Sequence, residues 1–159
     1  MEASEEETTI MSLGPQEHYP LPDGYAFRTG VPDAATYCRL RKISGLTPRT
    51  LCAVQAGLPH TLYGVHVVHG SDIVGMGRMI GDGALFIHVV DIAVDPAHQG
   101  HGIGSAIVDA IMRHICSTIP AEIYVSLMAN GEAWRLYERF GFSNVFPDAR
   151  GMAIWIDRP

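Results

Sequence analysis

The sequence has few cysteines and no long apolar run. Its cysteines, Cys38, Cys52 and Cys116, are odd in number, widely spaced and without a CxxC pair, so we expect reduced, buried thiols and no disulfide framework. No apolar run approaches the roughly 18 residues needed to cross a bilayer. The first residues lack a basic stretch followed by an apolar one, so the sequence does not predict a signal peptide. A cytoplasmic protein is expected.

Positive charge is also scarce. The 159 residues hold 11 Lys and Arg against 17 Asp and Glu, a net charge of -6, which argues against a nucleic-acid or membrane-surface binder. Much of the excess lies in residues 1–22, an expected acidic, mobile tail. Residues 23–159 then form one domain of ordinary soluble composition. The eight histidines show no metal-ligand spacing, so no metal is expected.

The apolar pattern predicts one mixed α/β sheet in a single domain. Three runs rich in Val and Ile, separated by short turns, predict an antiparallel meander. Ile103, Ile107, Ile111 and Ile115 recur every four residues and predict a helix facing the core. The expected strands are 25–31, 63–69, 73–80, 85–94, 123–128 and 152–156, and the expected helices are 33–44, 50–57, 103–115 and 132–140.

The stretch DPAHQGHGIGS, residues 95–105, joins the expected fourth strand to the long helix. A glycine-rich loop at a helix N-terminus aims several backbone N–H groups at one point, which suits a phosphate or pyrophosphate. The P-loop is excluded because no lysine lies here. The dinucleotide fingerprint is excluded because Ser105 stands where its last glycine would be, and because the loop does not follow the first strand.

Two motifs resemble the GNAT superfamily of acetyl-CoA-dependent N-acetyltransferases. The first is Gln99-x-x-Gly102-x-Gly104, similar to that family's pyrophosphate loop. The second is NGEAWRLYERFGF, residues 130–142, where Asn130, Ala133 and Tyr137 precede Gly-Phe. The resemblance covers roughly residues 25–156 and implies the GNAT fold, acetyl-CoA as acetyl donor, and direct attack by an amine in a ternary complex. It also implies a homodimer, since similar domains often pair through their C-terminal strands.

The resemblance assigns the binding residues. It implies contacts with acetyl-CoA from the end of the fourth strand, the loop and the second motif: Ile92, Ala93, Val94, Gln99, Gly100, His101, Gly102, Ile103, Gly104, Ser105, Asn130, Ala133 and Tyr137. It implies an acceptor pocket lined by Phe27, Tyr37, Leu46, Thr47 and Phe86. Asn130 has the alternative role of helix N-cap.

Acetyl transfer to an amine needs an acid for the leaving thiolate and a route for the amine's proton. Tyr137 is the candidate acid, because a phenol with a pKa of ~10 is protonated at pH 7; the alternative is that Tyr137 only packs. His88 and Asp91 are the candidate bases, with solvent as the third possibility. Simple alternation places His88, Val90 and Ile92 on one face of the strand, and Val89, Asp91 and Ala93 on the other. Only one of the two candidate bases should then face the acetyl group unless a bulge intervenes, and the enzymes that this chain resembles splay this strand near its end.

The composition of the expected pocket favours a small primary amine, of arylalkylamine or amino-sugar type. A protein N-terminus or a lysine side chain is the alternative acceptor. The third hypothesis is a domain that binds acetyl-CoA without turnover. An open peptide groove would indicate a protein acceptor, and a closed pocket would indicate a small one.

Overall fold

The computed structural model describes residues 17–119 and 122–156. Residues 1–16, most of the expected acidic tail, lie outside the described residues. The strands are β1 (Tyr25–Thr29), β2 (Tyr63–His69), β3 (Asp72–Gly81), β4 (Phe86–Val94) and β5 (Tyr124–Leu127). The helices are α1 (Ala34–Ile43), α2 (Leu51–Gly57), α3 (Ile103–Thr118) and α4 (Trp134–Glu138), with short 3-10 turns at Leu58–His60, Pro96–His98 and Gly131–Ala133.

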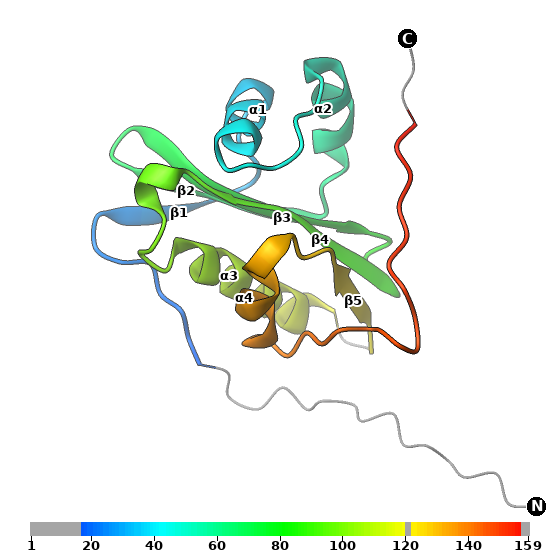
Figure 1. The fold of residues 1–159 in the computed structure, drawn as a ribbon. Coiled ribbons are helices and arrows are strands. Elements are labelled where there is room, and N and C mark those ends of the chain that lie inside the picture. The colour runs from blue at the N-terminus through cyan, green and yellow to red at the C-terminus, as the bar shows by residue number, and fades with distance from the viewer. Residues whose placement is uncertain (1–16, 120–121, 157–159) are drawn as a thin grey trace, which may run out of the picture.

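The described strands form one mixed sheet in the order β1-β2-β3-β4-β5. The first four run antiparallel, which confirms the predicted meander, and β5 lies parallel to β4. Helices α1 and α2 cover one face of the sheet, and α3 and α4 cover the other (Figure 1). The predicted mixed α/β fold in one domain is therefore confirmed.

Helix α3 supplies most of the core on its face. Ile103, Ile107, Ile111 and Ile115 are all buried there, as their four-residue spacing predicted. They pack against the inward side chains of β2, β3 and β4. A smaller apolar cluster around Leu40 lies between the sheet and the other helix pair. In the part of the chain that is described, no helix is both long and apolar enough to cross a membrane.

The last six residues of the expected tail are ordered against this core. Tyr19 and Leu21 pack on it, and the Tyr19 ring lies 5.2 Å from that of Phe140. The imidazole of His18 lies 2.8 Å from a carboxylate oxygen of Asp109 on α3. Residues 17–22 thus pack with the domain that was expected to begin at residue 23.

Two local expectations were wrong. Met152–Ile156, expected as the last strand, has no regular structure, and its side chains are exposed; alternation can indicate a strand, but a strand also needs a partner. Cys52 and Cys116, expected to be buried, are exposed.

A β-bulge at Asp91 changes the faces of β4 on which the side chains after Val90 lie. Opposite β3, Met76 pairs with Ala93 and Arg78 with Val90, so that Asp91 and Ile92 together face Gly77. Asp91 takes the left-handed conformation, with φ 61°. Gly77 leaves room for this, because a Cβ there would come within 2.6 Å of the Ile92 side chain.

The bulge changes which side chains share a face. Ile92 packs into the α3 core, whereas Ala93 packs with the α1 and α2 cluster. Asp91 contacts Tyr37 and Arg41 of α1. The alternation expected from the sequence is therefore wrong beyond Val90, and His88 and Asp91 lie on the same face.

Candidate active site

Strands β4 and β5 part halfway along β4. They pair from Phe86 with Tyr124 to Val89 with Leu127, and β5 ends there while β4 continues to Val94. Beyond Val89, β4 has no strand partner on that side among the described residues. The main chain of Ile92, Ala93 and Val94, predicted to bind the donor, thus lies along the opening between the strands.

The loop that follows β4 presents the first amides of α3. Gly102 is the N-cap of that helix and has φ 79°, and no side chain caps the helix. The first N–H groups of a helix have no partner within the helix, and the helix dipole favours an anion beside them. The loop therefore fits the pyrophosphate predicted from its sequence.

The space around this loop also suits a ligand. Gly100 and Gly102 both have positive φ, and a Cβ at either would meet no atom within 4 Å. Gly104, by contrast, lies against Leu136 and Val94. At the first two positions glycine serves the backbone conformation, and the volume in front of the loop stays open.

Side chains fasten the loop to the sheet. The Gln99 amide donates to the carbonyl of Val94 at 3.0 Å, so Gln99 turns its side chain back to β4. The hydroxyl of Tyr25 lies 2.8 Å from Nδ1 of His98, and the His101 ring lies 3.2 Å from the carbonyl of His98. These contacts hold the loop, and its residues Gly100, His101 and Gly102 are exposed.

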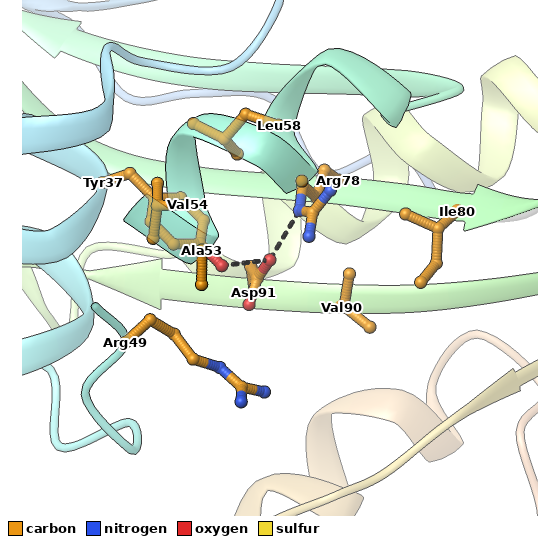
Figure 2. A pocket seen from close by; sticks show the side chains of 10 residues that line it. Tyr37, Arg49, Ala53, Val54, Leu58, Arg78, Ile80, Val90 and Asp91 are labelled. Carbon is orange, nitrogen blue, oxygen red and sulfur yellow. Dashed lines mark hydrogen bonds and ion pairs between the residues drawn. The ribbon is translucent and has the colours of Figure 1, made fainter. Parts of the chain in front are cut away.

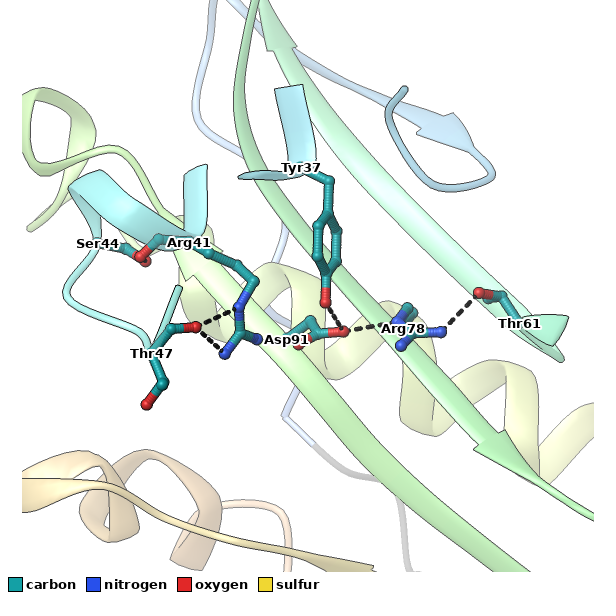
Figure 3. Close-up of polar contacts among 7 residues, drawn as sticks. All are labelled: Tyr37, Arg41, Ser44, Thr47, Thr61, Arg78 and Asp91. Carbon is teal, nitrogen blue, oxygen red and sulfur yellow. Dashed lines mark hydrogen bonds and ion pairs between the residues drawn. The ribbon is translucent and has the colours of Figure 1, made fainter. Parts of the chain in front are cut away.

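A buried charge cluster surrounds Asp91 on the α1 face (Figure 3). Arg41 donates to Oδ1 of Asp91, and Arg78 donates from Nε to Oδ2 at 2.6 Å. Tyr37 donates its hydroxyl to Oδ2 at 2.7 Å. The Asp91 side chain is 7% exposed, and Arg41 and Arg78 are 8% and 14% exposed. Burial raises the pKa of Tyr37, and the bond to Asp91 raises it further.

Both arginines of the cluster have further partners. Arg41 donates from Nε and Nη2 to the carbonyl of Thr47, at 2.8 and 2.6 Å. Arg78 donates from Nη1 to the hydroxyl of Thr61 at 3.0 Å. The cluster therefore joins α1, the loop after it, β3 and β4, and it fixes Asp91 with three donors on its two oxygens.

A hollow of about 270 Å³ opens beside this cluster (Figure 2). It lies between α1, α2 and the middle of β3 and β4. Its lining includes Tyr37, Arg49, Val54, Arg78, Val90 and Asp91. Val90 directly follows Val89, the last residue of β4 that pairs with β5. This hollow therefore adjoins the point where β4 and β5 part.

His88 lies two residues before Val90, on the same face of β4. Its Nδ1 is 3.0 Å from the hydroxyl of Ser126, the residue paired with it on β5. The half-buried ring therefore sits across the two strands just before they separate.

Tyr137 lies on the other side of the strand opening. It is 8% exposed and packs edge-on against Phe142, with ring centroids 6.1 Å apart. It lines a second hollow, of about 660 Å³, together with Leu127 and Met128 at the end of β5. Burial raises the pKa of Tyr137.

Asn130 and Ala133 of the second motif, residues 130–142, lie at the short turn before α4. Asn130 is the N-cap of the 3-10 turn before α4, but its side chain makes no capping hydrogen bond. Ala133 packs on the core beside this turn. The N-cap role suggested for the Asn130 side chain is therefore not seen, and that side chain is exposed.

The structure brings part of the expected acceptor pocket together. Tyr37 lines the smaller hollow, and Thr47 reaches the cluster through its carbonyl. Leu46 packs beneath α1. Phe27 packs on the opposite face, in the α3 core, and Phe86 is 61% exposed at the start of β4. Phe27 and Phe86 were thus misplaced, because the sequence alone does not show which face of a strand meets which helices.

No buried arginine was predicted at this site. Arg41 and Arg78 are both buried against Asp91, although charged side chains are mostly exposed in proteins. A signal existed for one of them, since Tyr37 and Arg41 are four residues apart on a helix and must share a face. Arg49, in the loop before α2, carried no such signal.

The comparisons with known proteins agree with this geometry. The family model described as "Acetyltransferase (GNAT) domain" matches residues 61–144. A Staphylococcus aureus protein of known structure, named "Probable Acetyltransferase", is 39% identical, with a TM-score of 0.80; the match covers 83% of this chain and 99% of that chain. A GNAT-family acetyltransferase from Streptococcus pneumoniae shares the fold, at 23% identity and a TM-score of 0.66, covering 85% of this chain and 99% of that one.

Two curated plant proteins match a shorter part. "Histone acetyltransferase TAP1" of Glycine max is 28% identical over 98 residues, covering 58% of this chain and 42% of that protein. "GCN5-related N-acetyltransferase 2, chloroplastic" of Arabidopsis thaliana is 31% identical over 80 residues, covering 50% and 30%. The chain spans less than half the length of these curated relatives. The family match and the open strand pair beside an amide-rich loop lead to one conclusion: the chain belongs to the GNAT acetyltransferase family.

Proposed function

We propose that this protein is an acetyl-CoA-dependent N-acetyltransferase that acetylates the primary amine of a small molecule by direct attack in a ternary complex. The observation that carries the proposal is the position of the 270 Å³ hollow beside the opening between β4 and β5. A donor arm lying in that opening would present its acetyl group to an amine held in the hollow. The volume suits a small acceptor.

The donor would be held by main chain. The amides from Gly100 to Ser105 would bind the pyrophosphate at the N-terminus of α3, where the helix dipole favours an anion. The backbone of Ile92, Ala93 and Val94 would pair with the pantetheine arm, and its N–H groups would stabilise negative charge on the thioester oxygen. Asn130 precedes the turn Gly131–Ala133, and Ala133 ends it just before α4, the helix of Tyr137; both would contact the donor from this side.

Tyr137 is the proposed acid. Its raised pKa keeps the phenol protonated at neutral pH, which is the form that can return a proton to the leaving thiolate. Its place beside the end of β5 supports this role, because that is where a donor arm between β4 and β5 would end.

His88 is the proposed proton acceptor, acting through water. Its Nδ1 faces Ser126, and it lies on the same face of β4 as the acceptor hollow. Asp91 is the less suitable base, because three donors already occupy its two oxygens. Its proposed role is to position Tyr37 and Arg78 at the wall of the hollow.

A thiol-release assay with acetyl-CoA tests the proposal directly. The acceptor panel contains arylalkylamines, amino sugars, polyamines, and peptides with free N-termini or lysines. We expect release with one or more small primary amines and little with the peptides. Binding of acetyl-CoA with no release for any acceptor would favour the alternative of a binding domain without turnover.

A protein acceptor is the second candidate, favoured by the name of the Glycine max relative. Lysine-rich tails are cationic, however, and the hollow already carries two arginines on its lining. Release with the peptides alone would support this candidate and contradict the first one.

We further propose a homodimer in the cytoplasm, with no nucleic-acid or membrane partner. Support for the dimer comes from β5, an edge strand among the described residues, and from the exposed apolar side chains of Met152, Ile154 and Ile156. Light scattering on the purified full chain tests the dimer, and a monomer at micromolar concentration would contradict it.

A further inference from the structure

The acceptor hollow carries an excess of positive charge. Arg41 and Arg78 share the single carboxylate of Asp91, and Arg49 also lies on the lining. Counting Arg41, which contacts Asp91 but does not line the hollow, three guanidinium groups stand against one carboxylate, a sum of +2. Asp91 is the only acidic residue among the lining residues that the structure describes.

Arg49 is the guanidinium of this group that Asp91 does not neutralise. It forms no ion pair with a carboxylate among residues 17–119 and 122–156. One face of its guanidinium lies over the ring of Trp155, 4.4 Å from the centroid. Stacking orients the group while leaving its N–H edges available. Figure 2 shows Arg49 and Arg78 on either side of Asp91 at the hollow.

Arg78 adds donor capacity. It donates from Nε to Asp91 and from Nη1 to Thr61. Within the described part of the chain, Nη2 has no hydrogen-bond partner. A planar guanidinium matches the two oxygens of a carboxylate or the oxygens of a phosphate.

On this basis we propose that the acceptor carries an anionic group, a carboxylate or a phosphate, near its primary amine, and that Arg49 binds this group with help from Arg78. The proposal rests on the proposed function of the hollow as acceptor site. An amine alone would enter as a cation and be repelled by the excess charge, whereas a second, anionic group offsets it. The same positive charge favours the neutral form of the bound amine, which is the form that attacks.

Matched acceptors provide the test. Phenylalanine differs from 2-phenylethylamine by a carboxylate, and glucosamine 6-phosphate differs from glucosamine by a phosphate. We expect the anionic member of one or both pairs to have the higher kcat/KM, by about tenfold to a hundredfold, as for a hydrogen bond to a charged group. Which pair responds distinguishes the carboxylate from the phosphate.

Arg49→Gln should remove this preference, and Arg49→Glu should reverse it toward the neutral amines. Arg28→Gln is the matched control, since Arg28 donates to the carbonyl of Phe27 and does not line the hollow. Equal kcat/KM within both pairs, or a preference unaffected by Arg49→Gln, overturns the proposal.

Calorimetric titration of the same four amines into the CoA-bound protein separates this inference from the proposed function. Tighter binding of an anionic amine, lost in Arg49→Gln, supports the inference even if no amine is acetylated. Acetylation of the neutral amines with no gain from the anionic group supports the proposed function and overturns the inference. If the protein neither binds nor acetylates an anionic amine in preference to its neutral partner, the inference is also overturned.

Discussion

Arg78 donates from Nε to Oδ2 of Asp91 at 2.6 Å, and the two residues lie on the neighbouring strands β3 and β4 beside the β-bulge. The bond reaches across β3 and β4 at the one position where their register shifts. Because Asp91 also receives Arg41 and Tyr37 from α1, the bulge and the docking of α1 depend on the same carboxylate. The wall of the acceptor hollow and the packing of the α1 face are therefore built from one charge cluster.

Asp91→Asn should destabilise the fold by about 3 kcal/mol or more, because it leaves two buried arginines without their countercharge. Asparagine tolerates the left-handed backbone of this position, so the variant tests the charge and adds little strain. Urea unfolding measures the effect. Asp23→Asn, which removes the same charge from an exposed turn, should change the free energy of unfolding by less than about 0.5 kcal/mol. Equal effects of the two variants would contradict a structural role for the cluster.

Gly77→Ala should cost about 1 to 3 kcal/mol by overpacking. A Cβ there would lie 2.5 Å from Ile107 and 2.6 Å from Ile92, so either α3 or the bulge must shift. Gly57→Ala is the control, since nothing lies within 4 Å of a Cβ at that helix end. Thermal unfolding of both variants compares them, and a stability loss no larger for Gly77→Ala than for Gly57→Ala would rule out the close packing.

Local periodicity predicted the parts of the fold that depend on neighbours in sequence. The β2 strand and the start of α3 lie where the pattern placed them, and the loop between β4 and α3 has the glycine conformations that an anion site requires. The bulge at Asp91 could not be predicted in this way. It depends on Gly77 across the sheet and on Arg41 from a helix fifty residues earlier in the chain.

The same limit explains the misplaced pocket residues. Non-local pairing decides which face of a strand meets α1 and which meets α3. Phe27 was therefore expected in the acceptor pocket, but it packs on the α3 face. Arg49 reaches the hollow only through the course of the loop before α2. The residues that set the charge of the site are therefore those for which the sequence carried the weakest signal.

Asp33→Ala should lower stability at neutral pH by about 1 kcal/mol, the usual value of an N-cap. The Asp33 carboxylate accepts from the amides of Ala35 and Thr36 at the start of α1, at 3.0 and 3.1 Å. Hydrogen bonds from Thr36 hold the pKa of Asp33 below its usual value. A lowered folded-state pKa stabilises the fold above the unfolded value, and this is lost as the pH falls through the folded value.

The gap between wild type and Asp33→Ala should therefore narrow as the pH drops below the ordinary range of an aspartate. Asp33→Ser keeps a capping oxygen without a titrating group, so its stability relative to Asp33→Ala should not depend on pH in this range. Urea unfolding between pH 7 and strongly acidic conditions measures both. A constant gap between wild type and Asp33→Ala would contradict the lowered pKa.

Tyr137→Phe should reduce turnover about a hundredfold or more while leaving acetyl-CoA affinity nearly unchanged, as expected for loss of a general acid. Because burial raises the pKa of Tyr137 above the usual 10.0, any fall in wild-type rate from its ionisation should come only above pH 10. Tyr63→Phe is the control, since its ring stacks on His114 away from both hollows. Steady-state rates and CoA titration measure the two effects, and unchanged turnover in Tyr137→Phe would remove it as the acid.

Gly102→Ala should weaken acetyl-CoA binding and also destabilise the fold. The residue has φ 79°, and an alanine in the left-handed region costs about 1 to 2 kcal/mol; its Cβ would also enter the open space before the amides of α3. Gly83→Ala is a close match, with φ 80° and no atom within 4 Å of a Cβ, but it lies in the turn between β3 and β4. Both variants should lose similar stability, so only a change in acetyl-CoA affinity separates strain from ligand contact. Equal affinity in the two variants, measured by calorimetry, would show that the loop does not hold the pyrophosphate.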